Sequence, residues 1–337
     1  GVDGNDDSKK ANIDINLFFL QSVIGEFIPK RNNFYCIMKT LIVLLGPTGV
    51  GKTDLSIRLA RHFHTSILSC DSRQIYKEMR IGTAVPSDEQ LATVPHYFIQ
   101  TLSVRDYYNS WQFEVDALAK IRELFESQKV VLMTGGSMLY IDAVCKGIDD
   151  IPTIAPELRA ELTEIYEREG IEAIRLMLKE LDPVFYEQVD LNNGKRVLHA
   201  VEVCRMAGVP YSSLRTNTPK DRGFRIIRIG LNREREELYG RIDQRVDLML
   251  EEGLEDEARQ LWPLRHLNAL NTVGYKELFD YFEGKTDYAE AVRLIKRNSR
   301  RYARKQLSWF RRDDDIRWFH PDDYEGIVEA ITAACGR

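Results

Sequence analysis

The sequence lacks a cysteine framework: its five cysteines are scattered, and no C-x-x-C pair occurs among them. An odd, unpaired set excludes a disulfide scaffold and a zinc site of the usual spacing, and it is typical of a reducing compartment. No apolar run reaches the roughly 18 residues that span a bilayer, so we expect no membrane association and a cytoplasmic location. The net charge is −5, so the composition as a whole does not indicate a nucleic-acid binder.

Wholesale disorder is excluded as well, because 44% of the residues are hydrophobic and 29% are charged. A chain of 337 residues suits two or so compact units. Residues 1–37 lack the unbroken apolar core of a signal peptide, since Lys30 and Arg31 follow interrupted apolar pieces. We interpret residues 1–37 as a leader or added extension, and we expect the working chain to begin near Met38.

Short apolar runs alternate with amphipathic stretches in two parts of the chain. The runs that predict strands are 41–45, 66–69, 130–133, 224–231 and 316–319. The stretches that predict helices are 54–63, 115–127, 234–261 and 288–312. Strands that alternate with helices favour an open parallel sheet with right-handed crossovers, so residues 38–150 and 224–337 are predicted to form one α/β core.

Between these parts, residues 151–223 contain helical stretches and no strand-like run. Pro152 and Pro156 mark the entry, and Pro219 and Gly223 mark the exit. The charged helical stretches are 157–169, 171–180 and 195–206. The segment is predicted to be an all-helical insertion within the α/β core.

A phosphate-binding loop is the strongest motif. The sequence Gly46-Pro47-Thr48-Gly49-Val50-Gly51-Lys52-Thr53 matches G-x-x-x-x-G-K-[ST] and lies between a predicted strand and a predicted helix. Its glycines allow backbone N–H groups to surround a phosphate, and the helix N-terminus adds partial positive charge. Lys52 would contact phosphate oxygens, and Thr53 would offer its hydroxyl to Mg²⁺.

Asp71 follows the second predicted strand directly, with Ser72, Arg73 and Gln74 after it. Open parallel sheets bind ligands at the carboxyl ends of their strands. Asp71 could therefore hold magnesium through water or accept a proton, and it could equally be a turn aspartate.

An acidic residue is missing where an ordinary ATPase would have one. The predicted strand 130–133 runs into Thr134-Gly135-Gly136-Ser137, without the carboxylate that would bind magnesium. The glycines favour close approach of the backbone to a ligand, with a hydroxyl contact from Ser137. The loop could therefore hold a diphosphate that is not ATP.

Acidic residues are also absent between Arg293 and Arg312, although nine Lys and Arg residues fall there. Several recur at helical spacing with Tyr302, Trp309 and Phe310 among them, which favours a nucleic acid or another polyanion over a solvated helix face. Arg241 and Arg245 on the preceding predicted helix could grip phosphate or pair with Asp243 and Asp247.

The motifs follow one another in an order that resembles the tRNA dimethylallyltransferase family, from about Thr40 to about Phe319. After the phosphate loop come S-C-D-S-R-Q-I-Y-K, I-G-T-A, P-H-Y, G-G-S-M-L-Y, R-I-D-Q-R-V-D-L-M, V-G-Y-K-E-L and R-K-Q-L-S-W-F-R. The resemblance implies a P-loop NTPase-like open parallel sheet flanked by helices, with an inserted helical domain that binds tRNA. It implies transfer of a dimethylallyl group from dimethylallyl diphosphate to the N6 amine of the adenosine that follows the anticodon.

Site residues follow from the same resemblance. Asp71 would be the general base, Lys52, Arg245 and the backbone of Gly49 and Gly51 would stabilise the leaving diphosphate, and Thr53 would bind Mg²⁺. Ser137, also among the catalytic residues, stands where the family has threonine. The residues that would contact the anticodon stem-loop of tRNA are Asp71, Ser72, Arg73, Gln74, Ser137, Arg159, Lys195, Arg196, His199, Asn271, Gly274, Tyr275, Lys276, Arg304, Lys305, Gln306, Trp309 and Arg311.

Three other functions remain open from the residues alone, and we expect a monomer in each case. An adenylate isopentenyltransferase would use the same donor on a free nucleotide, although it would need neither the helical insertion nor the basic helix. A P-loop kinase would transfer phosphate from ATP. An RNA-binding module would bind tRNA without turnover.

Overall fold

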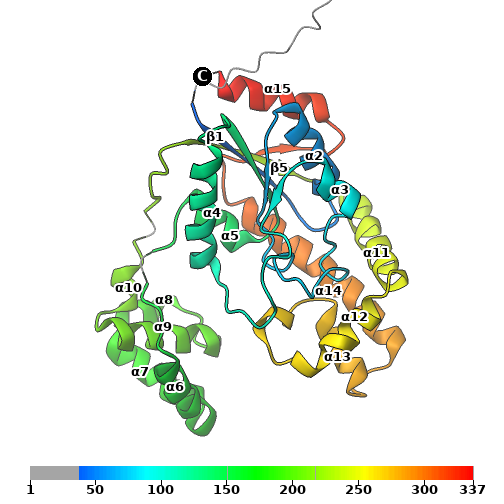
Figure 1. Cartoon of the computed structure of the whole chain (residues 1–337). Helices are drawn as coiled ribbons and strands as arrows, with labels where there is room; N and C mark the ends of the chain where they lie inside the picture. The colour runs from blue at the N-terminus through cyan, green and yellow to red at the C-terminus, as the bar shows by residue number, and fades with distance from the viewer. Residues whose placement is uncertain (1–37, 150, 217, 337) are drawn as a thin grey trace, which may run out of the picture.

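The computed structural model describes residues 38–149, 151–216 and 218–336 (Figure 1), so the predicted leader, residues 1–37, lies outside the described residues. A single sheet contains six strands, and every pair of neighbours is parallel. The strand order is β3 (His96–Tyr97), β2 (Ile67–Ser69), β4 (Val130–Gly135), β1 (Thr40–Leu45), β5 (Arg225–Leu231) and β6 (Arg317–Phe319). The predicted α/β class and parallel sheet are confirmed. Among the strands, only the two-residue β3 was not predicted.

Strand β1 lies in the middle of the sheet, and its six residues are all buried. Leu41 pairs with Val131 of β4 on one side and with Ile226 of β5 on the other. A strand that is covered on both faces has an unbroken apolar sequence, which explains why the run at 41–45 was recognisable.

Helices cover both faces of the sheet. Ile42 and Leu44 belong to the core cluster on the face with α2 (Lys52–His62), α11 (Arg235–Glu251) and α15 (Tyr324–Cys335). Leu41, Val43 and Leu45 point to the opposite face, against α4 (Ser110–Leu124) and α5 (Met138–Cys145). The alternation follows from the period of two in a strand.

The predicted helix 234–261 is two helices, α11 and α12 (Leu254–Leu261). Gly253 separates them with φ of 102°, a left-handed conformation that ends a helix and that glycine adopts at little cost. Helix α4 begins at Ser110, five residues before the predicted start, because Asn109 and Gln112 form a capping box. The remaining helices of the core are α3 (Asp88–Thr93), α13 (Tyr275–Phe282) and α14 (Tyr288–Phe310).

The insertion contains five helices that pack mainly on one another and lie to one side of the sheet (Figure 1). They are α6 (Pro156–Glu169), α7 (Ile171–Leu181), α8 (Pro183–Gln188), α9 (Gly194–Ala207) and α10 (Tyr211–Leu214). Leu162, Ile174, Leu178, Phe185 and Val197 form a buried cluster of their own. The insertion therefore has an independent apolar core.

Among the helices of the described residues, none is long and apolar enough to cross a membrane.

Candidate active site

The phosphate loop joins the end of β1 to the start of α2. Gly51 precedes α2 with φ of 106°, so the first N–H groups of the helix open toward the loop. Helix α11 backs the loop closely: a Cβ added at Gly49, whose φ is 79°, would lie 2.8 Å from Ile242 Cγ1. The loop is therefore shaped both by its glycines and by packing from a distant part of the chain.

Lys52 lies half-buried at the start of α2 and reaches back over the loop. Its Nζ donates hydrogen bonds to the carbonyl oxygens of Gly46 (2.9 Å) and Pro47 (2.8 Å). Burial, together with the positive charge of Arg245, lowers the pKa of Lys52 to about 8, while Asp71 opposes the shift. The ammonium is thus a poorly solvated cation that an added anion would stabilise.

Gln306 of α14 braces the phosphate loop from the side of α5. Its Oε1 accepts a hydrogen bond from the backbone N–H of Thr48 (2.9 Å), and its Nε2 donates to the carbonyl of Gly136 (2.9 Å). The side chain is 2% exposed, so its amide is engaged within the protein and not at the surface where an RNA contact was predicted. A Cβ at Gly136 would lie 2.3 Å from Gln306 Nε2, which explains the glycine there.

Asp71 forms the turn that was one of its two predicted possibilities. Its Oδ1 accepts from the backbone N–H groups of Arg73 (2.8 Å) and Gln74 (3.3 Å). Within the described residues no hydrogen bond reaches Oδ2, so one carboxylate oxygen stays available for a ligand or a proton. The turn orients the side chain and does not exclude a chemical role.

Ser137 connects the end of β4 to the turn after Asp71. Its hydroxyl accepts from the backbone N–H of Ser72 (2.8 Å) and bonds the Ser72 hydroxyl (3.1 Å). Gln74 is equally engaged: its Nε2 donates to the carbonyls of Thr83 and Ala84, both at 3.1 Å. These two polar side chains hold the loop that carries Asp71.

Arg245 of α11 completes a charged group with Lys52 and Asp71. Burial lowers the pKa of the Arg245 guanidinium, and the negative charge of Asp71 opposes that shift. The residues come from α11, from the phosphate loop and from the segment after β2. The structure thus brings together the three charged residues that the sequence placed far apart.

A cavity of about 50 Å³ lies beside the phosphate loop. Thr53, Ser69 and Asp71 contribute oxygen atoms to its lining, and Lys52 borders it. Magnesium takes oxygen ligands, keeps several waters and often binds through one or two carboxylates plus substrate phosphates. Among the described residues no cluster of three His, Cys, Asp or Glu could hold a metal, so the donors fit an ion held largely by diphosphate and water.

Two tyrosines lie near Asp71: Tyr302 was noted only as an aromatic of the basic helix, and Tyr140 was not predicted as a site residue. Burial, with the Asp71 charge adding to it, raises the pKa of Tyr302 of α14 to about 12. Burial also raises the pKa of Tyr140 of α5, with smaller effects from Tyr76, Arg73 and Asp71. Tyr140 is the last residue of the G-G-S-M-L-Y motif, so the motif could have identified it as a site residue. Tyr302 is partly exposed and could offer a ring face to a base near the charged group. Tyr140 is buried and its ring stacks on Phe113 at 4.2 Å, so it supports the site from behind.

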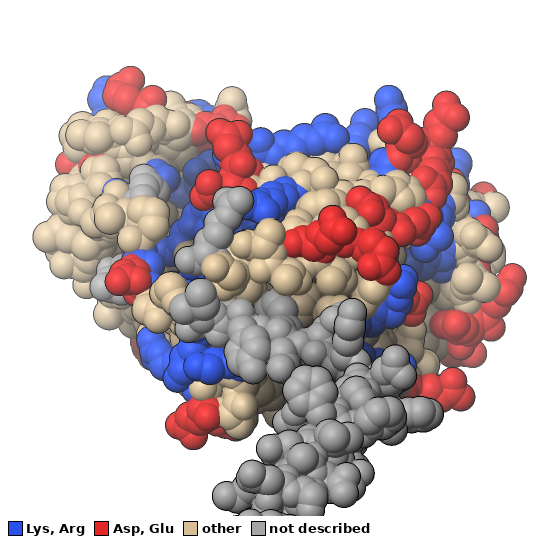
Figure 2. All heavy atoms as spheres, turned by 90° about the horizontal axis from the view of Figure 1, so that it is seen from above, with Lys and Arg blue, Asp and Glu red and all other residues tan. Residues whose placement is uncertain are grey.

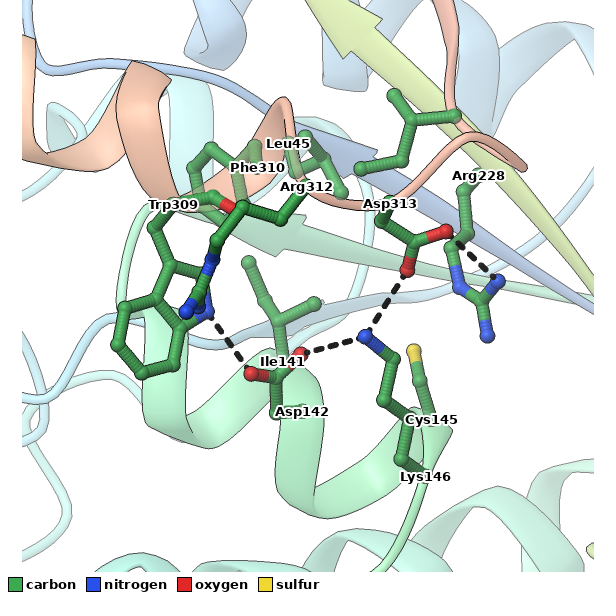
Figure 3. A pocket seen from close by; sticks show the side chains of 11 residues that line it. Leu45, Ile141, Asp142, Cys145, Lys146, Arg228, Trp309, Phe310, Arg312 and Asp313 are labelled. Carbon is green, nitrogen blue, oxygen red and sulfur yellow. Dashed lines mark hydrogen bonds and ion pairs between the residues drawn. The ribbon is translucent and has the colours of Figure 1, made fainter. Parts of the chain in front are cut away.

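A larger cavity of about 240 Å³ lies between α5 and the end of α14, and its charges compensate one another (Figure 3). Lys146 pairs with Asp142 (3.5 Å) and Asp313 (3.1 Å), and Arg228 pairs with Asp313 (3.7 Å). Trp309, a predicted RNA contact, donates from Nε1 to Asp142 (2.8 Å). Neither Lys52 nor Asp71 lines this cavity, so it is separate from the charged group.

The predicted RNA contacts of the insertion gather on α6 and α9. Arg159 Nε pairs with Glu202 (3.1 Å), and His199 Nδ1 lies 3.4 Å from the same carboxylate. Lys195 and Arg196 are exposed at the start of α9. The four residues form one basic surface, although Glu202 offsets part of its charge.

The segment before α13 divides into exposed and buried residues. Asn271 and Lys276 are exposed, whereas Gly274 and Tyr275 are buried. The Tyr275 side chain is 0% exposed and packs against Gly82, in the turn at 80–84. Only the exposed pair can present side chains to a partner in this conformation.

The basic stripe of α14 is neutralised in its first half. Arg293 pairs with Glu290 (2.6 Å), Lys296 with Asp247 (2.6 Å) and Arg300 with Asp243 (2.5 Å). The second half is exposed and carries no ion pair within the described residues; its members are Arg301, Arg304, Lys305, Arg311 and Arg312. The free positive charge is therefore shorter than the sequence suggested.

The face at the α15 end of the molecule carries charges of both signs. On the face seen from the α15 end, Lys and Arg lie among Asp and Glu (Figure 2).

A parallel sheet with a phosphate loop at the end of β1 defines an α/β protein of the phosphate-loop class. The IPP transferase family model matches residues 74–313. The tRNA dimethylallyltransferase 2 of Parabacteroides distasonis is 60% identical over 88% of this chain and 99% of its own length. The tRNA dimethylallyltransferase 1 of Bacteroides thetaiotaomicron is 56% identical over 87% of this chain and 96% of its own.

Solved structures give the same result. The tRNA isopentenylpyrophosphate transferase of Bacillus halodurans matches with a TM-score of 0.64 and 34% identity, over 88% of this chain and 96% of that one. A eukaryotic dimethylallyltransferase acting on tRNA matches with a TM-score of 0.73 and 26% identity, over 85% of this chain and 75% of that one. The chain belongs to the IPP transferase family.

Proposed function

We propose that this chain transfers a dimethylallyl group from dimethylallyl diphosphate to the N6 amine of the adenosine next to the anticodon of tRNA. It is a tRNA dimethylallyltransferase, like its relatives, and diphosphate is the second product. One observation carries the proposal: Lys52 and Asp71 line one cavity beside the phosphate loop, at the carboxyl end of the sheet. Arg245 lies near enough for its charge to lower the pKa of Lys52. Cations for a leaving diphosphate and a carboxylate for a proton are the two needs of this reaction.

The phosphate loop binds the donor's diphosphate. The backbone N–H groups of Gly49 and Gly51 surround it, and Lys52 and Arg245 neutralise the charge that develops as the allylic C–O bond breaks. Because both cations are poorly solvated, their interaction with the leaving group is stronger than it would be in water.

Asp71 receives the proton. The new C–N bond forms at N6, the amine proton passes to Asp71 Oδ2, and diphosphate leaves with the electrons of the broken C–O bond. Positioned proton transfer typically contributes about 10²–10⁴-fold. The turn that binds Asp71 Oδ1 keeps Oδ2 directed to this role, and Ser137 holds that turn through Ser72.

Magnesium is the proposed cofactor, with the Thr53 hydroxyl as its protein ligand. When bound, Mg²⁺ supplies positive charge to the diphosphate oxygens. The oxygen-lined cavity around Thr53 and Asp71 supports this choice.

The anticodon stem-loop is the proposed RNA partner. The basic surface of α6 and α9 lies on the insertion, and the free cations of α14 lie on the core, so the two could contact one RNA from different sides. Tyr302, which is partly exposed, could stack on the target base once it leaves the loop. Since one chain supplies all of these residues, we propose a monomer that acts on tRNA in the cytoplasm.

The test is transfer of labelled dimethylallyl from its diphosphate, with Mg²⁺, to unmodified tRNA and in parallel to AMP. Label on tRNA alone, with loss of transfer in EDTA and recovery on adding Mg²⁺, is the expected result. Label on AMP would instead indicate a free-nucleotide prenyltransferase. ATP hydrolysis without label transfer would indicate a kinase, and tRNA binding without turnover would indicate a binding module.

A further inference from the structure

Glu257 on α12 receives four hydrogen bonds although it lies outside the charged group. Its Oε2 accepts from the backbone N–H groups of Arg80 (3.0 Å) and Ile81 (2.8 Å). Its Oε1 accepts from the backbone N–H of Gly82 (2.9 Å) and from the Tyr275 hydroxyl (2.6 Å). Three consecutive N–H groups form a concavity suited to an anion, and here a side chain of the protein fills it.

The residues that Glu257 holds form a turn at 80–84 that also has hydrogen bonds of its own. Ala84 N donates to Ile81 O (2.9 Å) and Val85 N donates to Arg80 O (3.1 Å). Ala84 has φ of 49°, a left-handed conformation that costs free energy for a residue with a Cβ. The Thr83 hydroxyl also bonds the carbonyls of Met79 and Arg80, and the bonds to Glu257 fix this turn against α12.

The turn at 80–84 is connected to Asp71 through one side chain. Gln74 Nε2 donates to the carbonyls of Thr83 and Ala84, both at 3.1 Å. The backbone N–H of Gln74 donates in turn to Asp71 Oδ1. A continuous set of hydrogen bonds thus runs from Glu257 through the turn and Gln74 to the carboxylate of Asp71.

Tyr275 ties the same turn to the segment that precedes α13. A Cβ at Gly82 would lie 2.6 Å from the Tyr275 ring, so ring and turn are packed without spare room. Tyr275 follows directly on Asn271–Gly274, within the segment assigned to RNA contact. Helices α12 and α13 lie together below the sheet (Figure 1).

We propose that Glu257 is a positioning residue for prenyl transfer, which sets the place of Asp71 through the 80–84 turn and Gln74 and couples it to the segment before α13. The proposal rests on the proposed function, in which Asp71 accepts the amine proton. Glu257 touches no substrate; loss of its charge displaces the base and leaves the phosphate loop and the RNA surfaces unchanged.

The decisive variant is Glu257→Gln, because the amide keeps the volume and turns one acceptor into a donor that faces N–H groups. We expect kcat to fall by roughly 10- to 100-fold, since a misplacement of about 1 Å can cost about 10²-fold. The KM values for donor and tRNA should change by less than about threefold. Tyr275→Phe removes only one of the four hydrogen bonds and should show a smaller loss of kcat.

Glu255→Gln is the matched control. Glu255 lies on the same helix and pairs with exposed Arg259 (2.8 Å), so its substitution should leave kcat unchanged. A double variant with Gln74→Ala tests the route: if Glu257 acts through Gln74, the double loss should be about that of the worse single variant.

Three outcomes would overturn the proposal. Equal activity of Glu257→Gln and Glu255→Gln would show that Glu257 does not position the catalytic base. Multiplicative losses of kcat in the double variant would show that Glu257 does not act through Gln74. A rise in tRNA KM at unchanged kcat would make Glu257 part of RNA binding instead. Absence of transfer by the unsubstituted chain would contradict the proposed function itself, which separates the two failures.

Discussion

The sheet core and the helical insertion are held in different ways. In the core, the site is fixed by bonds from several elements, since Gln306 and Ser137 each join segments distant in sequence. The Asp71 turn adds a local bond. The insertion packs around its own apolar cluster and is fastened mainly where its two linkers meet the core.

One buried ion pair makes that junction. Glu114 of α4 accepts from Arg222 Nη2 (2.7 Å) and from the backbone N–H of Ile148 (2.9 Å). Arg222 also donates to the carbonyls of Ala143 (2.6 Å) and Val144 (2.8 Å) at the end of α5. The two linkers also bond each other, from Lys220 N to Lys146 O (2.8 Å) and from the Thr216 hydroxyl to Asp149 Oδ1 (2.7 Å). The chemical site is thus built into the core, whereas the insertion is attached through this short region. The comparison predicts that changes in the core alter turnover, whereas changes at the junction and on the RNA surfaces alter tRNA binding.

The largest effect is expected from Asp71→Ala. Loss of the proton acceptor should lower kcat by about 10²–10⁴-fold, with the tRNA dissociation constant changed by less than about twofold. Single-turnover transfer and a filter-binding assay measure the two quantities. Asp54→Ala, an exposed carboxylate on α2, is the control with normal kcat. Weakened tRNA binding at normal turnover would refute the base assignment.

The next effect is the pH dependence of donor capture through Lys52. Its pKa is lowered to about 8, so the free enzyme carries the full charge below pH 8 and loses it as pH rises through that value. We expect kcat/KM for the donor to fall above pH 8 by up to about tenfold per pH unit. Lys52→Arg stays charged over this range and should lack that inflection, whatever its absolute activity. A wild-type profile that is flat to pH 9.5 would contradict the lowered pKa.

A moderate effect is expected at the junction. Glu114→Gln removes the charge that faces buried Arg222 and weakens a charge-assisted hydrogen bond, worth about 1.5–3 kcal/mol. The insertion should then be less well positioned, and KM for tRNA should rise roughly 3- to 10-fold while KM for the donor is unchanged. Glu123→Gln, an exposed residue of the same helix, serves as control. An unchanged tRNA KM would mean that the insertion is positioned by other contacts.

The smallest effect is expected on α14. Arg301 is exposed and without an ion pair in the described chain, so Arg301→Gln should weaken tRNA binding about threefold and lower the salt dependence by about one counterion. Arg293→Gln is the matched control on the same helix, since Arg293 is already paired with Glu290. An equal salt dependence of tRNA binding in the two variants would show that Arg301 of α14 does not contact the RNA.

The sequence by itself determined the parallel sheet and the phosphate loop. Buried strands such as 41–45 are apolar throughout, and the loop needs specific residue types at fixed spacing, so both are local signals. Asp71 was identifiable because strand ends locate ligand sites in such sheets. The five helices of the insertion were only partly predicted, because α8 and α10 are short and their existence depends on packing.

Only the tertiary structure decided which side chains meet. Gln306 lies in a basic stretch that the sequence assigns to RNA binding, yet its side chain is buried and its amide bonds the phosphate loop. Three of the nine basic residues of the α14 stripe are paired with Asp243, Asp247 and Glu290, and two of these carboxylates come from another helix. Glu257 belongs to no motif, and its role becomes visible only because α12 packs against the turn at 80–84. Such contacts join residues far apart in the chain, and neither spacing nor composition carries that information.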